Sequence, residues 1–455
     1  MADGSAPATW SSRSAFLMAT IGAAVGLGNL WRFPYIAGEN GGGGFVLMYL
    51  GFVFLLGLPI VTAEMLMGRR GKGSAIATMA RLIREENASR HWKLIGWLSV
   101  LVPVVGLSYY AVVAAWALDY FALAAGDAFR DFDAASAEAT FATQSGAPLR
   151  QALLHGLFVV MTVAVVARGV NSGIERVSRF LMPALFFVIV LLVIYGFFRG
   201  DFSGALEFLF RPDFSNITGR SVLIALGQAL FSLAIGVGVM ITYAAYMPPR
   251  FSLHRSALTI CFGDTLVALL AGLAIFPIVF ASGLDPAGGP GLIFITLPIA
   301  FGNMPLGEFV GPLFFTLLIF AAYTTALGML EPIIAWLSER AGGGRARLTL
   351  VTGSLTWILG LVSVFSFSLL SDFHPLGVLG VDKTFFEILD FGIANFLLPL
   401  NALLITLFAG WVLSRRVTHE ELGESGDLWF RYWRFAVRYV APLAIAIVLV
   451  DLLTG

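Results

Sequence analysis

The chain has 455 residues, of which 58% are hydrophobic and only 12% are charged. A typical soluble domain is about 45–50% apolar and about 25% charged, and a soluble globule of this length could not bury so much apolar surface. The composition therefore excludes an ordinary cytosolic enzyme, a disordered chain and, with a single cysteine, a disulfide scaffold. It indicates an integral membrane protein. The formal net charge of +0 gives no overall attraction to nucleic acid.

Eleven stretches are long and apolar enough to cross a membrane, because a helical span needs about 20 apolar residues. In chain order, the predicted spans are 14–37, 43–68, 94–125, 151–168, 174–198, 220–247, 256–281, 308–338, 348–371, 384–414 and 431–453. The apolar segment 288–305 is broken by three prolines. We assign it to an external loop that partly folds back into the protein, with a further full span as the alternative. The fold class is thus an all-α polytopic membrane protein with 11 transmembrane helices.

The loops predict how the chain is oriented. With the N-terminus inside, most Lys and Arg residues fall in cytoplasmic loops, as the positive-inside rule requires. We expect a multi-pass protein of a bacterial-type inner (plasma) membrane, with its N-terminus cytoplasmic and its C-terminus external. The regions outside the two five-helix halves are then a cytoplasmic tail (1–13), an external loop (199–219), and a cytoplasmic loop with the eleventh helix (415–455).

Glycines interrupt the first helix of each five-helix half. The first span reads Gly-Ala-Ala-Val-Gly-Leu-Gly-Asn at 22–29, and the sixth has Gly-Val-Gly at 236–238. Close helix packing also selects glycine in membranes. Breaks at corresponding positions of two halves, 14–198 and 220–414, are instead typical of an inverted-repeat transporter with a binding site near the midplane, since unwound backbone is tolerated there only where it lines a cavity.

Charged residues inside the spans form a second anomaly, because each costs about 2.5–3.5 kcal/mol or more at a helix centre. Asp264 lies in a long apolar run, so we expect it to pair with a cation. For Glu64, near the end of its span, a solvated or locally paired terminus is equally open. Thr324 and Thr325 are adjacent; they can bond back to their own helix, but hydroxyls, carbonyls and carboxylates are also the ligands that hard cations take.

A long motif in the first span carries a family resemblance. The run Gly-Leu-Gly-Asn-Leu-Trp-Arg-Phe-Pro-Tyr at 26–35, followed by Glu-Asn-Gly-Gly at 39–42, is similar to the first-helix signature of the neurotransmitter:sodium symporter family. Residues 57–69 resemble the second helix of that family and residues 228–246 the sixth. The similarity runs from Trp10 to about residue 450 and is strongest to the bacterial amino-acid branch. It implies a leucine-transporter-type fold, with two inverted five-helix repeats plus one extra helix.

The resemblance implies two sodium ions and an amino-acid substrate moved by alternating access. The first sodium site would use Ala24, Asn29, Ser232 and Asp264. The second would use Gly22, Val25, Ala321, Thr324 and Thr325. The residues expected at the substrate are Ala24, Leu27, Gly28, Gly106, Tyr110, Val113, Phe231, Ser232, Ala234, Val237, Thr325 and Met329.

The expected substrate class depends on Gly26 and on the residues of the side-chain pocket. Relatives that carry monoamines place an aspartate where this chain has Gly26, so a zwitterionic α-amino acid is expected here. The side-chain pocket holds no charge, and the small Gly106 and Ala234 leave room for a hydrophobic, leucine-like to aromatic side chain, unless neighbouring side chains fill that space. Because Asp264 supplies a negative charge beside sodium, we expect no chloride, no organic cofactor, and an accompanying proton movement as one option.

The resemblance also places gates on both sides of the site. Arg32 and Asp390 would form the outer ionic gate, with Tyr110 and Phe231 as the aromatic lid. Tyr246 and Glu339 match the tyrosine and acid of the inner gate. The family's cation before Trp10 is missing, so Glu339 is expected to use Arg13 or another basic loop residue, or the gate is looser.

In the fifth span, Gly173 and Pro183 bracket nine residues, which resembles the family's helix-unwinding motif. A channel and a non-transporting amino-acid sensor are the alternative functions. An enzyme is not expected, since no nucleophile, base and orienting group cluster in the sequence.

Overall fold

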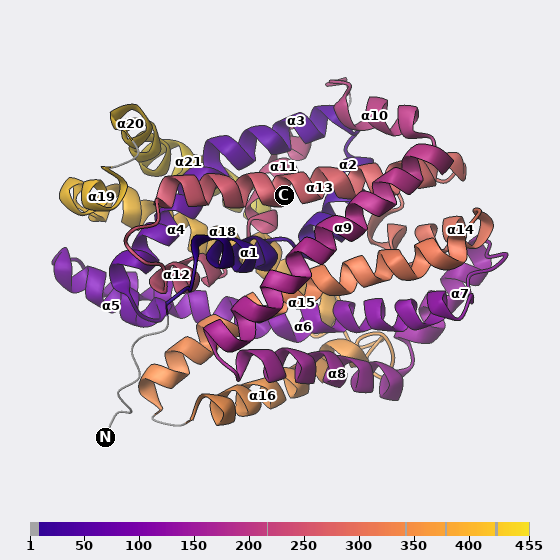
Figure 1. The fold of residues 1–455 in the computed structure, drawn as a ribbon, viewed down its shortest axis with the longest axis horizontal. Helices are drawn as coiled ribbons and strands as arrows, with labels where there is room; N and C mark the ends of the chain where they lie inside the picture. Colours follow the sequence, from indigo (N-terminus) through magenta and orange to yellow (C-terminus); the bar gives the residue numbers. More distant parts are fainter. Residues whose placement is uncertain (1–8, 216, 342–343, 378–379, 424–425, 455) are drawn as a thin grey trace.

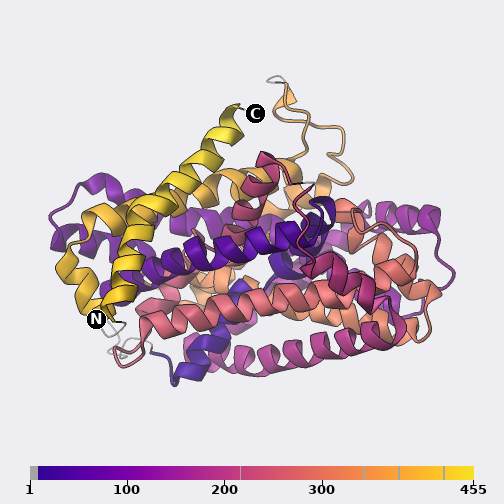
Figure 2. The same ribbon diagram turned by 90° about the horizontal axis from the view of Figure 1, so that it is seen from above.

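In the computed structural model, residues 9–215, 217–341, 344–377, 380–423 and 426–454 are described. These residues form helices and connecting turns, without a β-strand among them. The long helices run side by side along the long axis of the molecule (Figure 1), and the perpendicular view shows the same arrangement (Figure 2). The all-α class is confirmed.

The first half of the chain supplies the elements up to α9. They are α1 (Arg13–Ala24), the π-helical η1 (Gly28–Arg32), α2 (Phe33–Glu39), α3 (Gly43–Phe52), η2 (Val53–Gly57), α4 (Leu58–Gly71), α5 (Ala75–Glu85), α6 (Lys93–Ala125), α7 (Ala134–Ser145), α8 (Pro148–Val166), η4 (Val170–Glu175) and α9 (Arg176–Arg199).

The second half begins after α9, in the segment 200–218. Its elements are α10 (Phe202–Phe210), α11 (Gly219–Ser232), α12 (Val239–Ala245), α13 (Leu253–Ala281), η5 (Gly289–Leu292), α14 (Thr296–Asn303), α15 (Gly307–Arg340), α16 (Arg345–Phe365), α17 (Phe385–Phe391), η7 (Gly392–Leu397), α18 (Leu398–Leu407), η8 (Phe408–Val412), α19 (Arg415–Leu422), α20 (Asp427–Phe435), η10 (Ala436–Val440) and α21 (Ala441–Thr454).

Within the described residues, nine continuous helical segments are long and apolar enough to span a membrane. A tenth span is α1 with residues 28–39, which meet at a bend of 52°. The remaining predicted span consists of α11 and α12, each too short to cross alone and separated by residues 233–238, so the total of eleven stays a prediction. The predicted span 348–371 is too long at its end, because α16 stops at Phe365 and turns follow.

Short helices gather at the two ends of the molecule. Figure 1 shows α5, α19 and α20 at the end where the chain starts, and α7, α10 and α14 at the opposite end. Polar caps begin several of them: the side chains of Ser74, Asp133 and Asp201 accept hydrogen bonds from the first turns of α5, α7 and α10. In the segment 288–305, α14 buries Leu297 and Phe301, so the segment does pack back into the protein and is not a straight span.

The core lies around the broken helices. α6 and α15 pack along each other. Both contact α8, and α15 also contacts α1, while α12 packs against α4. Large apolar side chains are exposed on the outer helices, as a lipid-facing surface requires; Leu153 on α8, Phe187 on α9 and Leu355 on α16 are examples. The inverted relation of the two halves stays a prediction.

Candidate functional site

The first helix is interrupted at residues 25–27. Val25 has an extended backbone, and the helix resumes at Gly28. The side chain of Asn29 accepts a hydrogen bond from the Gly26 amide at 3.2 Å, and the Leu27 amide lies 3.4 Å from the Tyr110 hydroxyl oxygen. Glycine is required at 26, because a Cβ there would lie 2.5 Å from Oγ1 of Thr325. The break therefore leaves amide groups at the start of a buried helix, where anions are favoured.

The second break, at residues 233–238, is held open by side chains from two other helices. Ala234 and Gly236 have positive φ angles of 51° and 85°. The Gly236 amide donates to Glu64 on α4 at 2.8 Å, and its carbonyl accepts from Asn401 on α18 at 2.7 Å. Glu64 is fully buried, so the alternative of a solvated helix end is wrong for it. Its carboxylate instead satisfies backbone that the unwinding leaves without a partner.

A buried group of oxygen atoms lies where the two breaks approach α13. The Asn29 side chain donates to Oδ1 of Asp264 at 2.9 Å and lies 3.0 Å from Oγ of Ser232. The Ser232 hydroxyl donates to Oδ2 of Asp264 at 2.6 Å. Asn29 and Asp264 are fully buried and Ser232 nearly so. Three residues of the predicted first sodium site are thus brought together, whereas Ala24, at the end of α1, lines the central cavity described below.

The expected cation beside Asp264 is not a side chain. In the described ranges of the chain, the ion pairs formed by Lys and Arg involve other carboxylates. The two neighbours of Asp264 are neutral hydrogen-bond donors. A carboxylate that is desolvated in this way, with only neutral partners, favours a bound positive ion.

A second group of oxygens joins α15 to the first break. The Thr325 hydroxyl donates to the Val25 carbonyl at 3.1 Å and lies 3.5 Å from the Gly22 carbonyl. The Thr324 hydroxyl instead lies 3.1 Å from the carbonyl of Ala321 in its own helix. Thr324 thus forms the predicted hydrogen bond back to its own helix, whereas the Thr325 side chain turns towards the broken helix. All five residues predicted for the second sodium site meet in this region.

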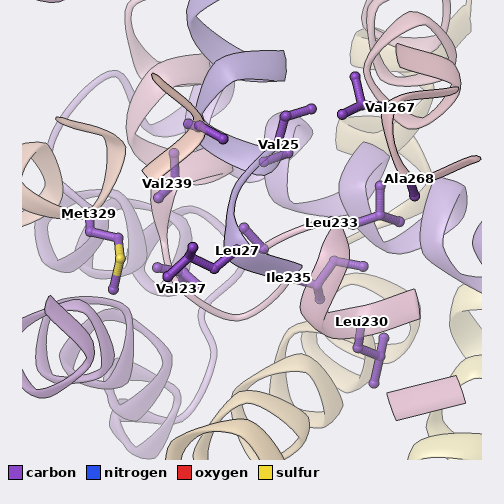
Figure 3. Packing of buried hydrophobic residues seen from close by; sticks show 14 of the residues in the cluster. Val25, Leu27, Leu230, Leu233, Ile235, Val237, Val239, Val267, Ala268 and Met329 are labelled. Atoms are coloured by element: carbon purple, nitrogen blue, oxygen red, sulfur yellow. The ribbon is translucent and has the colours of Figure 1, made fainter. Parts of the chain in front are cut away.

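Between these groups lies a central cavity of about 50 Å³. Most of the predicted substrate residues line it: Ala24, Leu27, Gly28, Gly106, Tyr110, Phe231, Ala234, Val237, Thr325 and Met329. In Figure 3, Leu27 and Val237 approach from the two broken segments, with Met329 beside them. A Cβ on Gly106 would lie 2.7 Å from Cε of Met329, so this methionine fills part of the space that the glycine leaves. Ser232 lies in the oxygen group instead.

A smaller cavity of about 30 Å³ lies beyond Phe231, and Val113 lines this one and not the central cavity. The guanidinium carbon of Arg32 lies 4.4 Å from the centre of the Phe231 ring, within range of a cation–π interaction. Asp390 lines the same cavity, but the ion pairs of the described chain include none between Arg32 and Asp390. The predicted outer-gate residues therefore lie together without a closed ionic contact.

On the opposite side, the two residues assigned to the inner gate, Tyr246 and Glu339, have different partners. The Tyr246 hydroxyl donates to Glu331 at 3.0 Å, and Arg345 forms an ion pair with the same carboxylate. Glu339 instead accepts from the backbone amide of Ser74 at 2.6 Å and from its hydroxyl. The physical reason is that Ser74 begins α5, where free amide groups attract a carboxylate. Among the described residues Glu339 forms no ion pair with Arg13, and its part in an inner gate stays a prediction.

The first described residues, 9–11, pack on the same side of the molecule as Tyr246. The Trp10 indole donates to the Tyr243 carbonyl at 2.8 Å, and its ring is 2% exposed. Ser11 hydrogen-bonds Glu175, and Asn171 donates to the Thr9 carbonyl at 2.8 Å. The segment before Trp10 in which the family's cation is missing lies mostly outside the described residues, in 1–8.

The fifth span is helical throughout. Gly173 lies in the π-helical segment η4, and Pro183 lies inside α9, which follows it without a break. A Cβ on Gly173 would lie 2.1 Å from the Val165 carbonyl oxygen, so glycine is needed there for close packing against α8. The unwinding of this segment stays a prediction for another conformation.

Several residues of the site were not predicted. Tyr49 lies 3.2 Å from Oγ of Ser232, and Gln228 donates to the Gly28 carbonyl at 2.8 Å. Asn401, at the second break, and Arg345, which pairs with Glu331 next to Tyr246, also belong to this set. Each is a polar residue in or next to an apolar span, which is a usable signal, but its partner depends on which helices become neighbours.

Three comparisons with known proteins each match nearly the whole length of this chain. A model of the Sodium:neurotransmitter symporter family matches residues 7–129 and 138–454. An uncharacterized sodium-dependent transporter of Bacillus subtilis is 39% identical, over 98% of both chains. The sodium-dependent dopamine transporter of Bos taurus is 24% identical, over 97% of this chain and 68% of the relative. The crystal structure of MhsT in complex with L-phenylalanine superposes with a TM-score of 0.88 at 36% identity, covering 98% of this chain and 100% of that one.

Proposed function

We propose that this chain, which belongs to the sodium:neurotransmitter symporter family, carries a neutral, hydrophobic α-amino acid together with sodium ions by alternating access. The family assigns it to membrane transporters. The single observation that carries the finer proposal is the fully buried carboxylate of Asp264, which has only neutral protein partners and lies where two broken helices meet.

The first sodium ion would bind at Asp264. A hard cation takes oxygen ligands, and the carboxylate, the Ser232 hydroxyl and the side-chain oxygen of Asn29 supply them in one place. The Asn29 amide group now donates to the carboxylate, so the side chain must turn to present its oxygen to an ion. Because Asp264 provides the negative charge itself, transport should not need chloride.

The second sodium ion would bind between α15 and the first break. The Thr325 hydroxyl oxygen already lies 3.1 Å from the Val25 carbonyl and 3.5 Å from the Gly22 carbonyl. A sodium ion there would take the Thr325 hydroxyl oxygen and the two carbonyl oxygens as ligands, in place of the hydrogen bond. It would thereby tie α15 to the broken helix. Occupation of this position would thereby link ion binding to the packing of the two helices.

The substrate would lie in the central cavity with its carboxylate at the start of η1. The amides of Leu27 and Gly28 and the Tyr110 hydroxyl favour a negative group there. Its ammonium group would meet the carbonyls of Phe231 and Ser232 at the end of α11, where the helix dipole is negative. Since Gly26 adds no charge, a zwitterion satisfies the site better than a monoamine.

The side chain of the substrate would extend towards Gly106 and Met329. The cavity of about 50 Å³ is too small for a large side chain as it stands. Methionine is unbranched and flexible, so rotation of Met329 away from Gly106 would enlarge it. MhsT, with which this fold superposes, binds L-phenylalanine in its structure, and this supports a pocket for leucine-like to aromatic side chains here.

Alternating access would use the two closures that flank the cavity. On one side, Arg32 lies over Phe231, and on the other, Tyr246, Glu331 and Arg345 form a partly buried network. Opening towards either side would require breaking one set of contacts while the other is kept, which is the requirement for coupled transport.

The test is uptake of a labelled amino-acid panel into proteoliposomes under an inward sodium gradient. We expect accumulation of leucine, phenylalanine or tryptophan above the outside concentration, and no accumulation without sodium. Saturable binding without accumulation would identify a sensor, and flux that never exceeds equilibration would identify a channel. If alanine and glycine outcompeted the large residues, the assignment of the pocket would be wrong.

A further inference from the structure

A groove lined by arginines runs along the outside of the last long helix, away from the transport site. Its volume is about 660 Å³, and its lining includes Arg415, Arg431, Arg434 and Arg438. The last three belong to α20 and η10 and are spaced three and four residues apart, so they share one face of a continuous helix. Figure 1 shows α19 and α20 together at the end where the chain starts.

The positive charges of this groove have no carboxylate partner in the described part of the chain. Among the residues that the structure describes, no carboxylate lines the groove or forms an ion pair with any of these four arginines. The neighbouring pocket around Arg69 and Arg70 differs, because Glu420 and Glu421 line it and pair with those arginines. Like charges one helical turn apart repel each other, so an anion from outside would stabilise this face.

Two of the arginines are held in place by neutral groups. The guanidinium carbon of Arg438 lies 4.1 Å from the centre of the Trp411 ring, and the Trp411 indole donates to the Arg438 carbonyl at 2.8 Å. Arg434 donates to the Thr418 hydroxyl at 3.1 Å. The Nε of Arg438 is buried and has no hydrogen-bond partner among the described atoms. These two guanidinium groups are thus oriented in advance, and their terminal nitrogens keep donors for a ligand.

Apolar side chains beside the groove indicate where the anion comes from. Trp411 is 54% exposed, Phe435 58% and Leu443 65%. Phe435 lines the groove, Trp411 lies against Arg438, and Leu443 belongs to α21, which continues from η10. Aromatic rings next to arginines at the end of a membrane helix are typical of the boundary between headgroups and acyl chains. A soluble anion would gain nothing from these apolar neighbours, whereas a lipid would bury its chains against them.

We propose that this groove binds the phosphate of an anionic phospholipid, with the acyl chains lying along Phe435 and Leu443. Arginine is suited to this role because its planar donors match phosphate oxygens in pairs, and basic pockets at helix ends are a recognised way of holding lipid headgroups. The site is separate from the sodium and substrate sites, so its existence does not depend on the proposed transport function.

The experiment is native mass spectrometry of the full-length protein with phosphatidylglycerol or with phosphatidylcholine of the same acyl chains. The test variant combines Arg431→Gln, Arg434→Gln and Arg438→Gln. The control variant removes three arginines elsewhere at the same end, all of them exposed, by Arg84→Gln, Arg90→Gln and Arg347→Gln. At a contribution of roughly a factor of five per arginine, the test variant should bind phosphatidylglycerol about a hundredfold more weakly, while the control stays within about threefold of wild type.

Further arms separate the possible outcomes. Inorganic phosphate and glycerol phosphate in millimolar excess should not displace the lipid; if they do, the groove is a site for soluble anions and the proposal fails. Equal retention of both lipids by wild type, or wild-type retention of phosphatidylglycerol by the test variant, would also overturn it. Circular dichroism checks that the variants fold. If the triple variant does not, the exposed Arg431→Gln alone should weaken binding about fivefold, and unchanged binding by that variant counts against the proposal.

Discussion

Replacing Asp264 by Asn tests whether its charge is what binds sodium. The substitution keeps the shape and one side-chain oxygen but removes the negative charge. The carboxylate oxygens lie 2.6 and 2.9 Å from atoms of Ser232 and Asn29, so an ion bound among these groups would be within about 4 Å of the charge. At an effective dielectric constant of about 20, that attraction is about 4 kcal/mol, which corresponds to about a thousandfold in affinity.

The measured loss should be smaller than this upper value, because the neutral side chain also avoids the cost of burying a charge. We expect the sodium concentration that half-saturates amino-acid binding to rise between about tenfold and a thousandfold. Asp119→Asn is the matched control: Asp119 is buried on α6 but pairs with Arg150, which is 49% exposed and stays solvated when the pair is lost. A sodium titration of labelled-phenylalanine binding to purified protein measures both. A change below about threefold for Asp264→Asn would refute the reasoning.

Three further predictions concern the cavity and the driving ions. Gly26→Ala should abolish uptake, because its Cβ would lie 2.5 Å from Oγ1 of Thr325, whereas Gly51→Ala, with nothing within 4 Å, should leave uptake unchanged; proteoliposome uptake compares them. Gly106→Ala should shift preference from aromatic towards smaller side chains by about 10- to 200-fold, since its Cβ meets Cε of Met329 at 2.7 Å; competition among unlabelled amino acids measures this, and an unchanged order would contradict it. Replacing chloride with gluconate should leave uptake unchanged, and a collapse of uptake would show that Asp264 does not replace chloride.

Much of the site could be predicted because its residues are unusual for their surroundings. Glycines in the first and sixth spans indicated the two breaks, and these lie at 25–27 and 233–238. Asp264 stood out as a charge in an apolar run, and the structure buries it fully. Each of these signals is local, since the cost of a glycine or a charge inside a membrane helix does not depend on which helix lies next to it.

The partners of those residues could not be predicted in the same way. Tyr246 and Glu339 were both assigned to the inner gate, but Tyr246 meets Glu331, eight positions earlier on α15, and Glu339 turns towards the start of α5. Both acids lie on one helix, and only the packing of α5 and α12 around it decides which acid meets which donor. Spacing along the chain does not contain that information.

The sequence by itself determined that this is a helical membrane protein with two interrupted helices and a buried carboxylate, because hydropathy, glycine content and intramembrane charge act within single segments. Only the tertiary structure decided that Glu64 and Asn401 hold the second break, that Met329 occupies the space beside Gly106, and that four arginines converge with no carboxylate from the described residues among them. Each of these depends on side chains from helices distant in sequence coming within a few ångströms of each other, and that is a property of packing.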